Sequence, residues 1–330
     1  MGNKASSTAN AAISNVEIEN AKKAYEKLKT KSFFNELNEL KTKIQGNIIL
    51  PTTEDAYQEA RRRPFNVEFR GYPLLIFRPQ NAQDVSIIVT FVREKCIGTA
   101  FCIQCGGHST RCMITDSICM DLVHMKTVRV DLEKALVEVG GGAYLKDVDD
   151  ALKPHNLGTP VGTYPLTGVG GLVLAGGYGF LSRMHGLSVD NLVEVEVVLA
   201  TGQIVVANDD NEYKNLIWGC RGGGGNFGIV TKFTFKVHKL PEKVYGGMKV
   251  YLAPTVNSAI GVHKHFDSML NTLPDNVTGF IVMPAAEPVV PTLWAYFGDK
   301  PSVKDVPELN AKLGGWMCVM NNIKVSYMYI

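Results

Sequence analysis

Apolar residues recur along residues 74–104 with the spacings of short strands and an amphipathic helix. LLIFRP (74–79) is a short apolar run that ends at a proline, which is typical of a strand. The segment 81–96 carries its apolar residues on one helical stripe and predicts an amphipathic helix. TAFCIQ (99–104) predicts the next strand. This region therefore begins in β-α-β order.

The pattern continues to residue 237 as short strands with two helices between them. Further strands are expected at 117–122, 126–131, 135–140, 192–200, 203–207 and 229–237. Helices are expected at 144–156 and at 209–219, the second with Asp209 or Asp210 as its N-cap. In 229–237 apolar residues alternate with Lys232, Thr234 and Lys236, which predicts a strand buried on one face only.

Both ends of the chain differ from this region. Residues 16–44 have helical spacing, which ends at Gly46. Beyond Pro241, the runs GGMKVYLAP, TGFIVMPAA and TLWAYFGD together with a helix over 255–272 predict a second, strand-rich α+β unit.

Composition is that of an ordinary soluble globular protein. The chain has 330 residues, 45% of them hydrophobic and 20% charged, and its net charge is +2. A charge so near zero gives no reason to expect nucleic acid as a partner. No apolar run is long enough to span a membrane, and seven irregularly spaced cysteines are typical of reduced thiols. We therefore expect a cytoplasmic protein.

The first residues, MGNKASSTANAAISN, lack the apolar core of a secretion signal. They fit the M-G-x-x-x-[ST] pattern for N-myristoylation, with Gly2 and Ser6 in place. One myristoyl chain at Gly2 would give only weak, reversible association with a membrane surface. The alternative is a disordered polar tail.

Glycine accounts for 32 residues, half of them in clusters at 106–107, 140–142, 168–179 and 222–228. No Gly-Lys-Ser/Thr follows a cluster, which excludes a Walker loop. The 168–179 segment also lacks the preceding strand and the later acidic residue of a dinucleotide fingerprint. For any single cluster, tight turns between crowded strands are the structural alternative.

Several clusters in one chain indicate a phosphate-bearing ligand. A pyrophosphate needs several backbone N–H donors, and glycine lets the backbone come near it. CGGHS (105–109), GVGGLVLAGGYG (168–179) and RGGGGNFGIV (221–230) offer three walls for an extended ligand with phosphates at its middle. His108 lies in the first of them, directly behind a predicted strand. Its alternative interpretation is a solvent-facing turn histidine.

The chain resembles the vanillyl-alcohol oxidase and p-cresol methylhydroxylase (PCMH) type of flavoproteins, most closely the berberine-bridge-enzyme-like branch. The resemblance covers roughly residues 40 to 240. Its matching segments are GNIILPTTEDAYQEARRRPFN, LLIFRPQNAQDVSIIVTFVRE, IQCGGHS, VGTYPLTGVGGLVLAGGYGFLSRMHGLSVDNLVEVEVVLATG and NLIWGCRGGGGNFGIVTKFTF. It implies an α+β fold: a two-subdomain PCMH-type FAD-binding domain followed by a partial α+β substrate domain with an antiparallel sheet. The expected divisions are an N-terminal tail and helix (1–40), the FAD-binding domain (41–240) and the partial substrate domain (241–330).

The resemblance also implies roles for individual residues. The position of the histidine that bonds to the 8α-methyl of FAD is His108 here, and the neighbouring amides of Cys105, Gly106, Gly107 and Ser109 would hold the pyrophosphate. The residues that would line the flavin are Thr163, Tyr164, Gly168, Val169, Gly170, Gly171, Leu172, Tyr178, Ile229 and Val230. The remaining histidines are expected at the surface or at helix caps: His124, His155, His185, His238, His263 and His265.

The sequence departs from the family pattern in two places. Many members of the branch form a second flavin bond through a cysteine of a G-T-C-P segment, but this chain reads GTYP, with Tyr164 at that position. We therefore expect one covalent link at most. Thr167 occupies the position that influences oxygen access in the family. The chain also stops at WMCVMNNIKVSYMYI, which matches no part of the family pattern and looks like a C-terminal truncation.

The function that this resemblance implies is an FAD-dependent oxidase. An alcohol, sugar or alkaloid-like substrate would give hydride to the flavin, and dioxygen would take the electrons to form hydrogen peroxide. The alternatives are a flavin-binding or regulatory protein without turnover, and a lipid-tethered scaffold without cofactor. No metal is expected, and no catalytic base is identified. Tyr251, Trp294 and Tyr296 lie on strands of the substrate unit, where core packing is their expected role.

Overall fold

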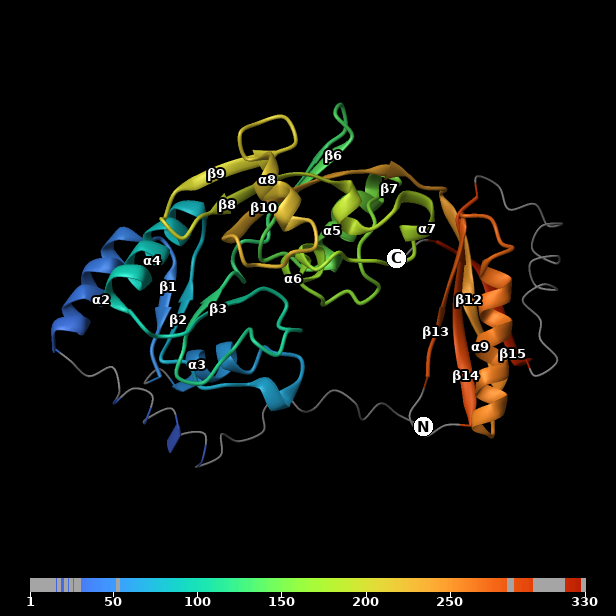
Figure 1. The fold of residues 1–330 in the computed structure, drawn as a ribbon, viewed down its shortest axis with the longest axis horizontal. Coiled ribbons are helices and arrows are strands. Elements are labelled where there is room, and N and C mark those ends of the chain that lie inside the picture. Colours follow the sequence, from blue (N-terminus) through green and yellow to red (C-terminus); the bar gives the residue numbers. More distant parts are fainter. Residues whose placement is uncertain are drawn as a thin grey trace.

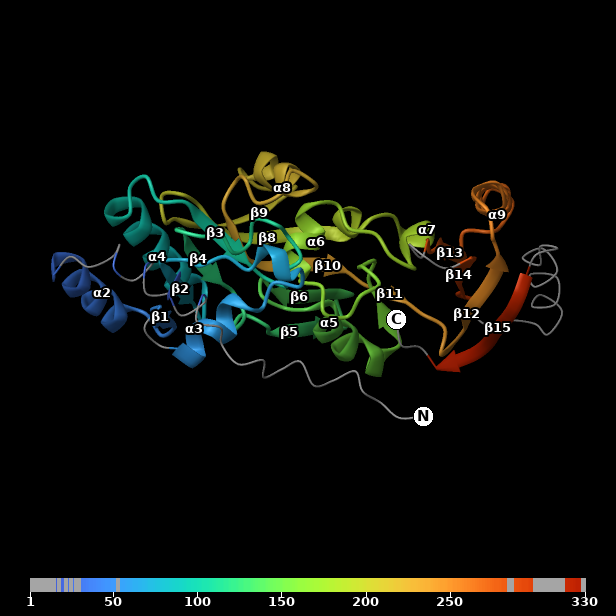
Figure 2. The same cartoon turned by 90° about the horizontal axis from the view of Figure 1, so that it is seen from below.

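The computed structural model describes residues 31–51, 54–283, 288–298 and 318–327, with a few helical positions between residues 16 and 26. The predictions for Gly2 and the N-terminal tail lie outside these residues. The molecule is elongated, with α2 (Lys31–Lys43) at one end and an antiparallel sheet covered by α9 (Val256–Leu270) at the other (Figures 1 and 2). None of the described helices is long and apolar enough to cross a membrane.

The first sheet confirms the predicted β-α-β beginning. Its strands are β1 (Asn47–Ile49), β2 (Leu75–Arg78), β3 (Phe101–Gln104) and β4 (Ile118–Asp121), in the order β1-β2-β4-β3. Strands β2 and β3 both run parallel to β4, whereas β1 is antiparallel to β2. Helix α4 (Ala82–Lys95) starts at an N-cap, Asn81, whose side chain accepts the Asp84 amide at 2.9 Å. Helix α3 (Glu54–Arg61) and the 3₁₀ turn η1 (Val67–Phe69) lie between β1 and β2.

The second sheet is antiparallel and carries the largest core. Its strands are β5 (Val128–Asp131), β6 (Leu136–Gly140), β8 (Leu192–Val198), β9 (Ile204–Asn208) and β10 (Ile229–Lys236), in the order β5-β6-β10-β8-β9. Apolar residues of α5 (Leu145–Leu152), α6 (Val169–Leu174) and α8 (Lys214–Cys220) belong to the same buried cluster as Phe233 and Phe235 of β10. A 3₁₀ turn, η2 (Lys153–His155), ends the α5 region near Pro154 as predicted.

Two sequence predictions in this region are wrong in detail. Helix α8 begins at Lys214 rather than near Asp209, because side chains of Asn208 and Asn211 accept nearby amides and hold a turn before it. Asp209 instead accepts two hydrogen bonds from Arg221, at 2.8 and 2.7 Å. On the predicted polar face of strand β10, Thr234 is only 6% exposed, whereas Lys232 is partly exposed and Lys236 is exposed.

The third sheet confirms the predicted strand-rich unit after Pro241. Its strands are β12 (Lys243–Leu252), β13 (Val277–Ile281), β14 (Val289–Tyr296) and β15 (Cys318–Tyr327), in the antiparallel order β13-β14-β12-β15. The terminal segment that matched no family pattern thus forms an edge strand along β12. Tyr251 and Trp294 are 2% and 3% exposed and pack with residues of α9, so the expectation of core packing is confirmed for both.

The third sheet is joined to the rest of the chain at one junction. Helix α7 (Ser182–His185) carries Arg183, which donates to the carbonyls of Val277 and Leu273 at 3.0 and 2.9 Å. Leu181 and Leu240 share a buried cluster with residues of β12 and β14. The short strands β7 (Leu157–Gly158) and β11 (His238–Lys239) pair beside this junction.

Two histidines expected at the surface or at helix caps stack on each other at the junction. The rings of His185 and His238 lie 3.7 Å apart at an interplanar angle of 8°. His238 Nε2 lies 2.6 Å from Asn191 Oδ1 in the 3₁₀ turn η3 (Ser188–Asn191). Burial, then the charges of His185 and Lys236, lower the pKa of His238 to about 4, and burial also lowers the pKa of His185. Both rings are therefore neutral at pH 7, and both are partly exposed, with His185 as the last residue of α7.

This stack predicts a loss of stability in mild acid. A histidine whose pKa is lowered by folding binds protons more readily in the unfolded chain, so its stabilising contribution is complete above about pH 6.5 and is lost as the pH falls toward 4. After discounting for solvent screening, we expect a loss of about 1–2 kcal/mol. Urea unfolding of wild type and His238→Gln near pH 7.5 and pH 5 measures it. Between the two pH values, His238→Gln should lose less stability than wild type. The control His155→Gln changes an exposed histidine and should lose as much stability as wild type. Equal losses in all three proteins would contradict the prediction.

Candidate functional site

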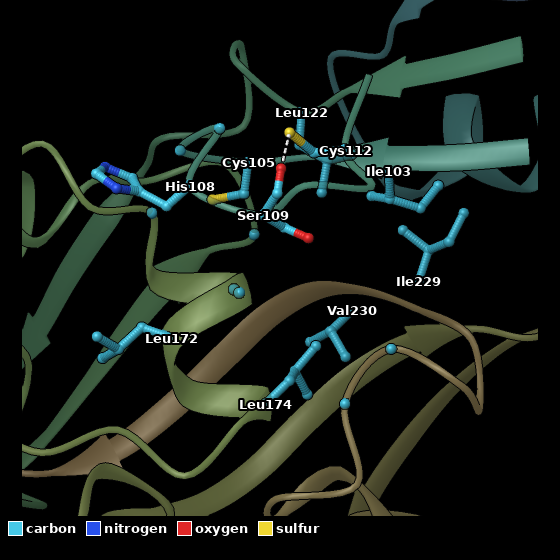
Figure 3. Close-up of a pocket in the computed structure, with 18 of the residues that line it drawn as sticks. Ile103, Cys105, His108, Ser109, Cys112, Leu122, Leu172, Leu174, Ile229 and Val230 are labelled. Atoms are coloured by element: carbon cyan, nitrogen blue, oxygen red, sulfur yellow. Dashed lines mark hydrogen bonds between the residues drawn. The ribbon is translucent and has the colours of Figure 1, made fainter. Parts of the chain in front are cut away.

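A cavity of about 570 Å³ lies where the first two sheets meet, and predicted glycine segments form most of its wall. It is lined by the turn after β3, the first turn of α6 and the start of β10, together with part of the 222–228 segment. Figure 3 draws His108 at the opposite end of this lining from Ile103 and Ile229. Three segments far apart in the sequence therefore converge on one elongated space. Its volume falls in the usual range for small-molecule and cofactor sites.

The glycines allow the turn after β3 and the start of α6 to touch through their backbones. A Cβ at Gly106 would lie 2.1 Å from the Gly168 amide nitrogen, and a Cβ at Gly168 would lie 2.2 Å from that of Gly106. Atoms approach no closer than about 3 Å without a clash, so neither position accepts a side chain. By contrast, a Cβ at Gly171 or Gly225 would meet nothing within 4 Å, although both residues line the cavity.

The same turn presents backbone donors that the chain itself does not use. Within the described part of the chain, the amides of Gly106, Gly107, His108 and Ser109 donate no hydrogen bond. Ser109 accepts a hydrogen bond from Cys112 Sγ at 3.0 Å through its carbonyl, the dashed contact in Figure 3, and this contact does not involve its amide. Unpaired backbone donors beside a cavity are costly unless water or a ligand satisfies them. A run of them suits an anionic ligand such as a diphosphate.

Burial and the amides of α6 affect the thiol at the start of the turn. Cys105 is partly buried on the cavity wall, and burial raises the pKa of its thiol, while the amides of Gly170 and Gly171 act in the opposite direction. The six cysteines between residues 96 and 220, Cys105 among them, are free thiols, as expected. Cys105 is therefore protonated at pH 7 and serves as a small packing group under the glycine turn.

A buried ionic network contacts the turn that follows β3. Arg63 pairs with Asp121 at the end of β4, and its guanidinium also donates to the Cys105 carbonyl at 3.0 Å and to Tyr144 Oη at 2.8 Å. Arg78 donates to the other oxygen of Asp121 at 2.9 Å. Burial would lower the pKa of Arg63, but the Asp121 carboxylate raises it above its ordinary value. Sequence reasoning missed this network, because its members are far apart in the chain.

His108 stands exposed at the rim of the cavity among aromatic side chains. Its ring stacks on Phe65 with 4.9 Å between centroids and an angle of 17°, and Tyr164 meets it edge-on at 5.7 Å. Phe65 is 63% exposed and Tyr164 is 44% exposed. The ring is thus held beside the cavity rather than inside the protein.

The structure brings together eleven of the fifteen residues that the resemblance implied. Those on the cavity wall are Cys105, Gly106, Gly107, His108, Ser109, Gly168, Gly170, Gly171, Leu172, Ile229 and Val230. Thr163 and Tyr164 lie on the exposed loop before α6. Val169 is buried in the core, and its amide donates to the Ala143 carbonyl at 2.9 Å. Tyr178 lies away from the wall and stacks on Phe280 of β13 at 6.2 Å.

Sequence reasoning assigned no cofactor contact to several other residues of the wall. They are Ile103, Cys112, Leu122, Gly141, Thr167, Leu174, Gly224, Gly225, Gly228 and Phe233. The glycines among them belong to clusters visible in the sequence, so that signal was available. The apolar residues carry no such signal, because strand residues that face a core and strand residues that face a cavity look alike in sequence. No cluster of histidine, cysteine and carboxylate side chains suitable for a metal ion occurs in the described residues.

Comparison with known proteins identifies the domain around the cavity. Residues 73–208 match the family model of an FAD binding domain. A curated relative, the FAD-linked oxidoreductase pgmH of Aspergillus terreus, is 39% identical over 207 residues, which are 62% of this chain and 42% of the relative. The chain thus spans less than half the length of this relative.

Solved structures share the fold as well. The BBE-like 1 protein of Physcomitrella patens has a TM-score of 0.75 at 26% identity, over 88% of this chain and 61% of that one. Glucooligosaccharide oxidase from Acremonium strictum, whose FAD is described as 6-S-cysteinyl and 8α-N1-histidyl, has a TM-score of 0.71 at 26% identity, over 85% of this chain and 58% of that one. Residues 73–208 therefore form an FAD binding domain, and the chain is similar in sequence and fold to berberine-bridge-enzyme-like FAD-linked oxidoreductases, as its motifs indicated.

Proposed function

We propose that this chain is an oxidase that carries FAD in the glycine-lined cavity, bound covalently through His108. One observation supports the proposal most strongly: four consecutive residues on the cavity wall, Gly106 to Ser109, have amides that donate no hydrogen bond within the described residues, and one of them, His108, carries an exposed imidazole. Donors suited to a diphosphate and a nucleophilic ring thus occupy one turn. The fit is good, because glycine leaves the wall free of side chains where the ligand must approach closely.

The residues of the cavity would bind FAD and orient it. The amides of Gly106 to Ser109 would hold the diphosphate, while Gly170 and Gly171 would form the side of the cavity next to it. Ile229 and Val230 line the cavity from the start of β10, where they would pack against a flat heterocycle. When bound, FAD supplies two-electron redox chemistry between a substrate C–H bond and dioxygen, with hydrogen peroxide as the product. These residues would contribute to the reaction by positioning the cofactor.

His108 would form the covalent link by its ring nitrogen. The new N–C bond would replace the ring N–H bond and one C–H bond of the 8α-methyl group; the two hydrogens would be lost as protons, and dioxygen would take up two electrons and two protons to give hydrogen peroxide. The similar glucooligosaccharide oxidase carries an 8α-histidyl bond together with a cysteinyl bond. Tyr164 has no thiol, so we propose the histidyl bond alone.

The substrate that we propose is a small molecule with an oxidisable C–H bond beside oxygen or nitrogen. The likeness to an oligosaccharide oxidase supports this class. Tyr251 and Trp294 are buried against α9, away from the cavity, so neither is proposed as the catalytic base.

The test begins with the purified full chain. We expect a yellow protein whose colour stays in the pellet after acid precipitation, and peroxide release in a screen of alcohols, sugars and cyclic amines. Colour without peroxide on any of these substrates would refute the oxidase and favour a flavin-binding protein without turnover. A well-folded colourless chain that takes up no added FAD would refute the whole proposal.

A further inference from the structure

We propose that Phe65 is a positioning residue that holds the His108 imidazole in place for its covalent attachment to FAD. This inference rests on the proposed histidyl link. Nothing in the composition or motifs of the chain assigns a role to Phe65, which lies between α3 and η1, outside every glycine cluster. It does not line the cavity, so it would act through His108 rather than on the cofactor.

The first evidence is the arrangement of three rings at the rim. Phe65 covers one face of the His108 ring, with centroids 4.9 Å apart and planes only 17° from parallel. Tyr164 lies edge-on to both rings, and its ring centroid is 5.7 Å from that of His108 and 5.8 Å from that of Phe65. An exposed imidazole would otherwise sample several staggered rotamers. Contacts from two directions restrict those rotations.

The second evidence is that the segment carrying Phe65 is fastened to the turn carrying His108. The Phe65 amide donates to the Gly107 carbonyl at 2.9 Å. Gly107 has a φ of +76°, and a Cβ there would lie 3.0 Å from both the Arg63 carbonyl oxygen and Pro64 Cα. Arg63 in turn binds the Cys105 carbonyl and the buried Asp121. Residues 63–65 and the 105–108 turn therefore hold a fixed relative position.

The third evidence is the exposure of Phe65 itself. A phenylalanine that is 63% exposed gains little from burial, so the hydrophobic effect alone does not account for an aromatic residue here. Its stacking contact is with a ring that must reach one carbon of the bound cofactor. Fixing such a nucleophile before reaction removes rotational freedom that would otherwise slow bond formation. Phe65 takes no part in the transfer of protons or electrons described for His108.

The experiment measures the covalent link directly. The full chain is produced without flavin, mixed with FAD, and sampled over time for flavin that survives acid precipitation, with intact mass as a second readout. We expect Phe65→Ala to slow the appearance of acid-stable flavin by roughly five- to tenfold, about the contribution of one aromatic contact and its rotamers. Phe65→Tyr keeps the stacked ring and should form acid-stable flavin at the wild-type rate. Phe69→Ala, an exposed phenylalanine four residues further on in η1, serves as the matched control and should leave the rate unchanged.

The outcomes separate the two proposals. Wild type without acid-stable flavin would overturn the histidyl link and this inference with it. Wild type that forms the link while Phe65→Ala forms it equally fast would overturn the inference alone. If Phe65→Ala fails to fold, Phe65→Leu takes its place, because it keeps apolar bulk and lacks the flat ring. Slow linkage in Phe65→Leu, with unchanged quenching of FAD fluorescence on initial binding, supports the positioning role, and a wild-type rate contradicts it.

Discussion

Replacing His108 with alanine is expected to release the flavin from covalent attachment. Alanine has no ring nitrogen to bond the 8α carbon, whereas the amides of Gly106 to Ser109 and the glycine wall stay in place. The variant should still bind FAD, but acid precipitation should move the yellow colour almost completely from the pellet to the supernatant. Its intact mass should lack the mass of one FAD. Because Tyr164 offers no thiol for a second bond, no residual covalent fraction is expected.

The control for this variant is another exposed histidine far from the cavity. His155 lies in the 3₁₀ turn after α5, and His155→Ala should retain acid-stable colour. Flavin that stays fixed to His108→Ala would show that a different side chain forms the bond. A His108→Ala protein that binds no FAD at all would show that the imidazole is required for noncovalent binding as well, which the geometry does not predict.

Replacing Gly168 with alanine is expected to damage the fold and the cavity together. The added Cβ would lie 2.2 Å from the Gly106 amide nitrogen and 2.4 Å from Cys105 Sγ, and the first of these is backbone that cannot rotate away. This clash is relieved only if the turn after β3 moves away from α6. We expect a loss of about 3 kcal/mol or more in the free energy of unfolding, because overpacking at a backbone contact exceeds the usual cost of a core insertion. Thermal unfolding and FAD titration measure the two effects.

A glycine in open surroundings provides the matched comparison. Gly261 lies inside α9, and a Cβ there would meet nothing within 4 Å. Gly261→Ala should therefore raise stability by roughly 0.5–1 kcal/mol, through helix propensity, and leave FAD binding unchanged. A Gly168→Ala protein that unfolds at the wild-type temperature and binds FAD normally would contradict the close contact between the two glycine segments.

Local pattern predicted most of the elements and part of the cavity wall. The strand and helix of the first β-α unit fall within a residue or two of their predicted bounds, since alternation and helical stripes report which face of an element is buried. The prediction failed at α8, where Asn208 and Asn211 compete with the helix for backbone amides. The divisions at residues 40 and 240 and the roles of the individual site residues stay predictions.

The sequence by itself determined where the chain can turn tightly and let a ligand approach its backbone closely, because glycine carries no side chain, and this was enough to expect a diphosphate-bearing cofactor. The tertiary structure decided which of those glycines meet one another and which face open space. It also decided that Arg63 reaches Asp121, 58 positions away, that Phe65 covers His108, and that His185 stacks on His238. These contacts join residues whose local sequence looks ordinary, and only the packing of separate elements brings them together.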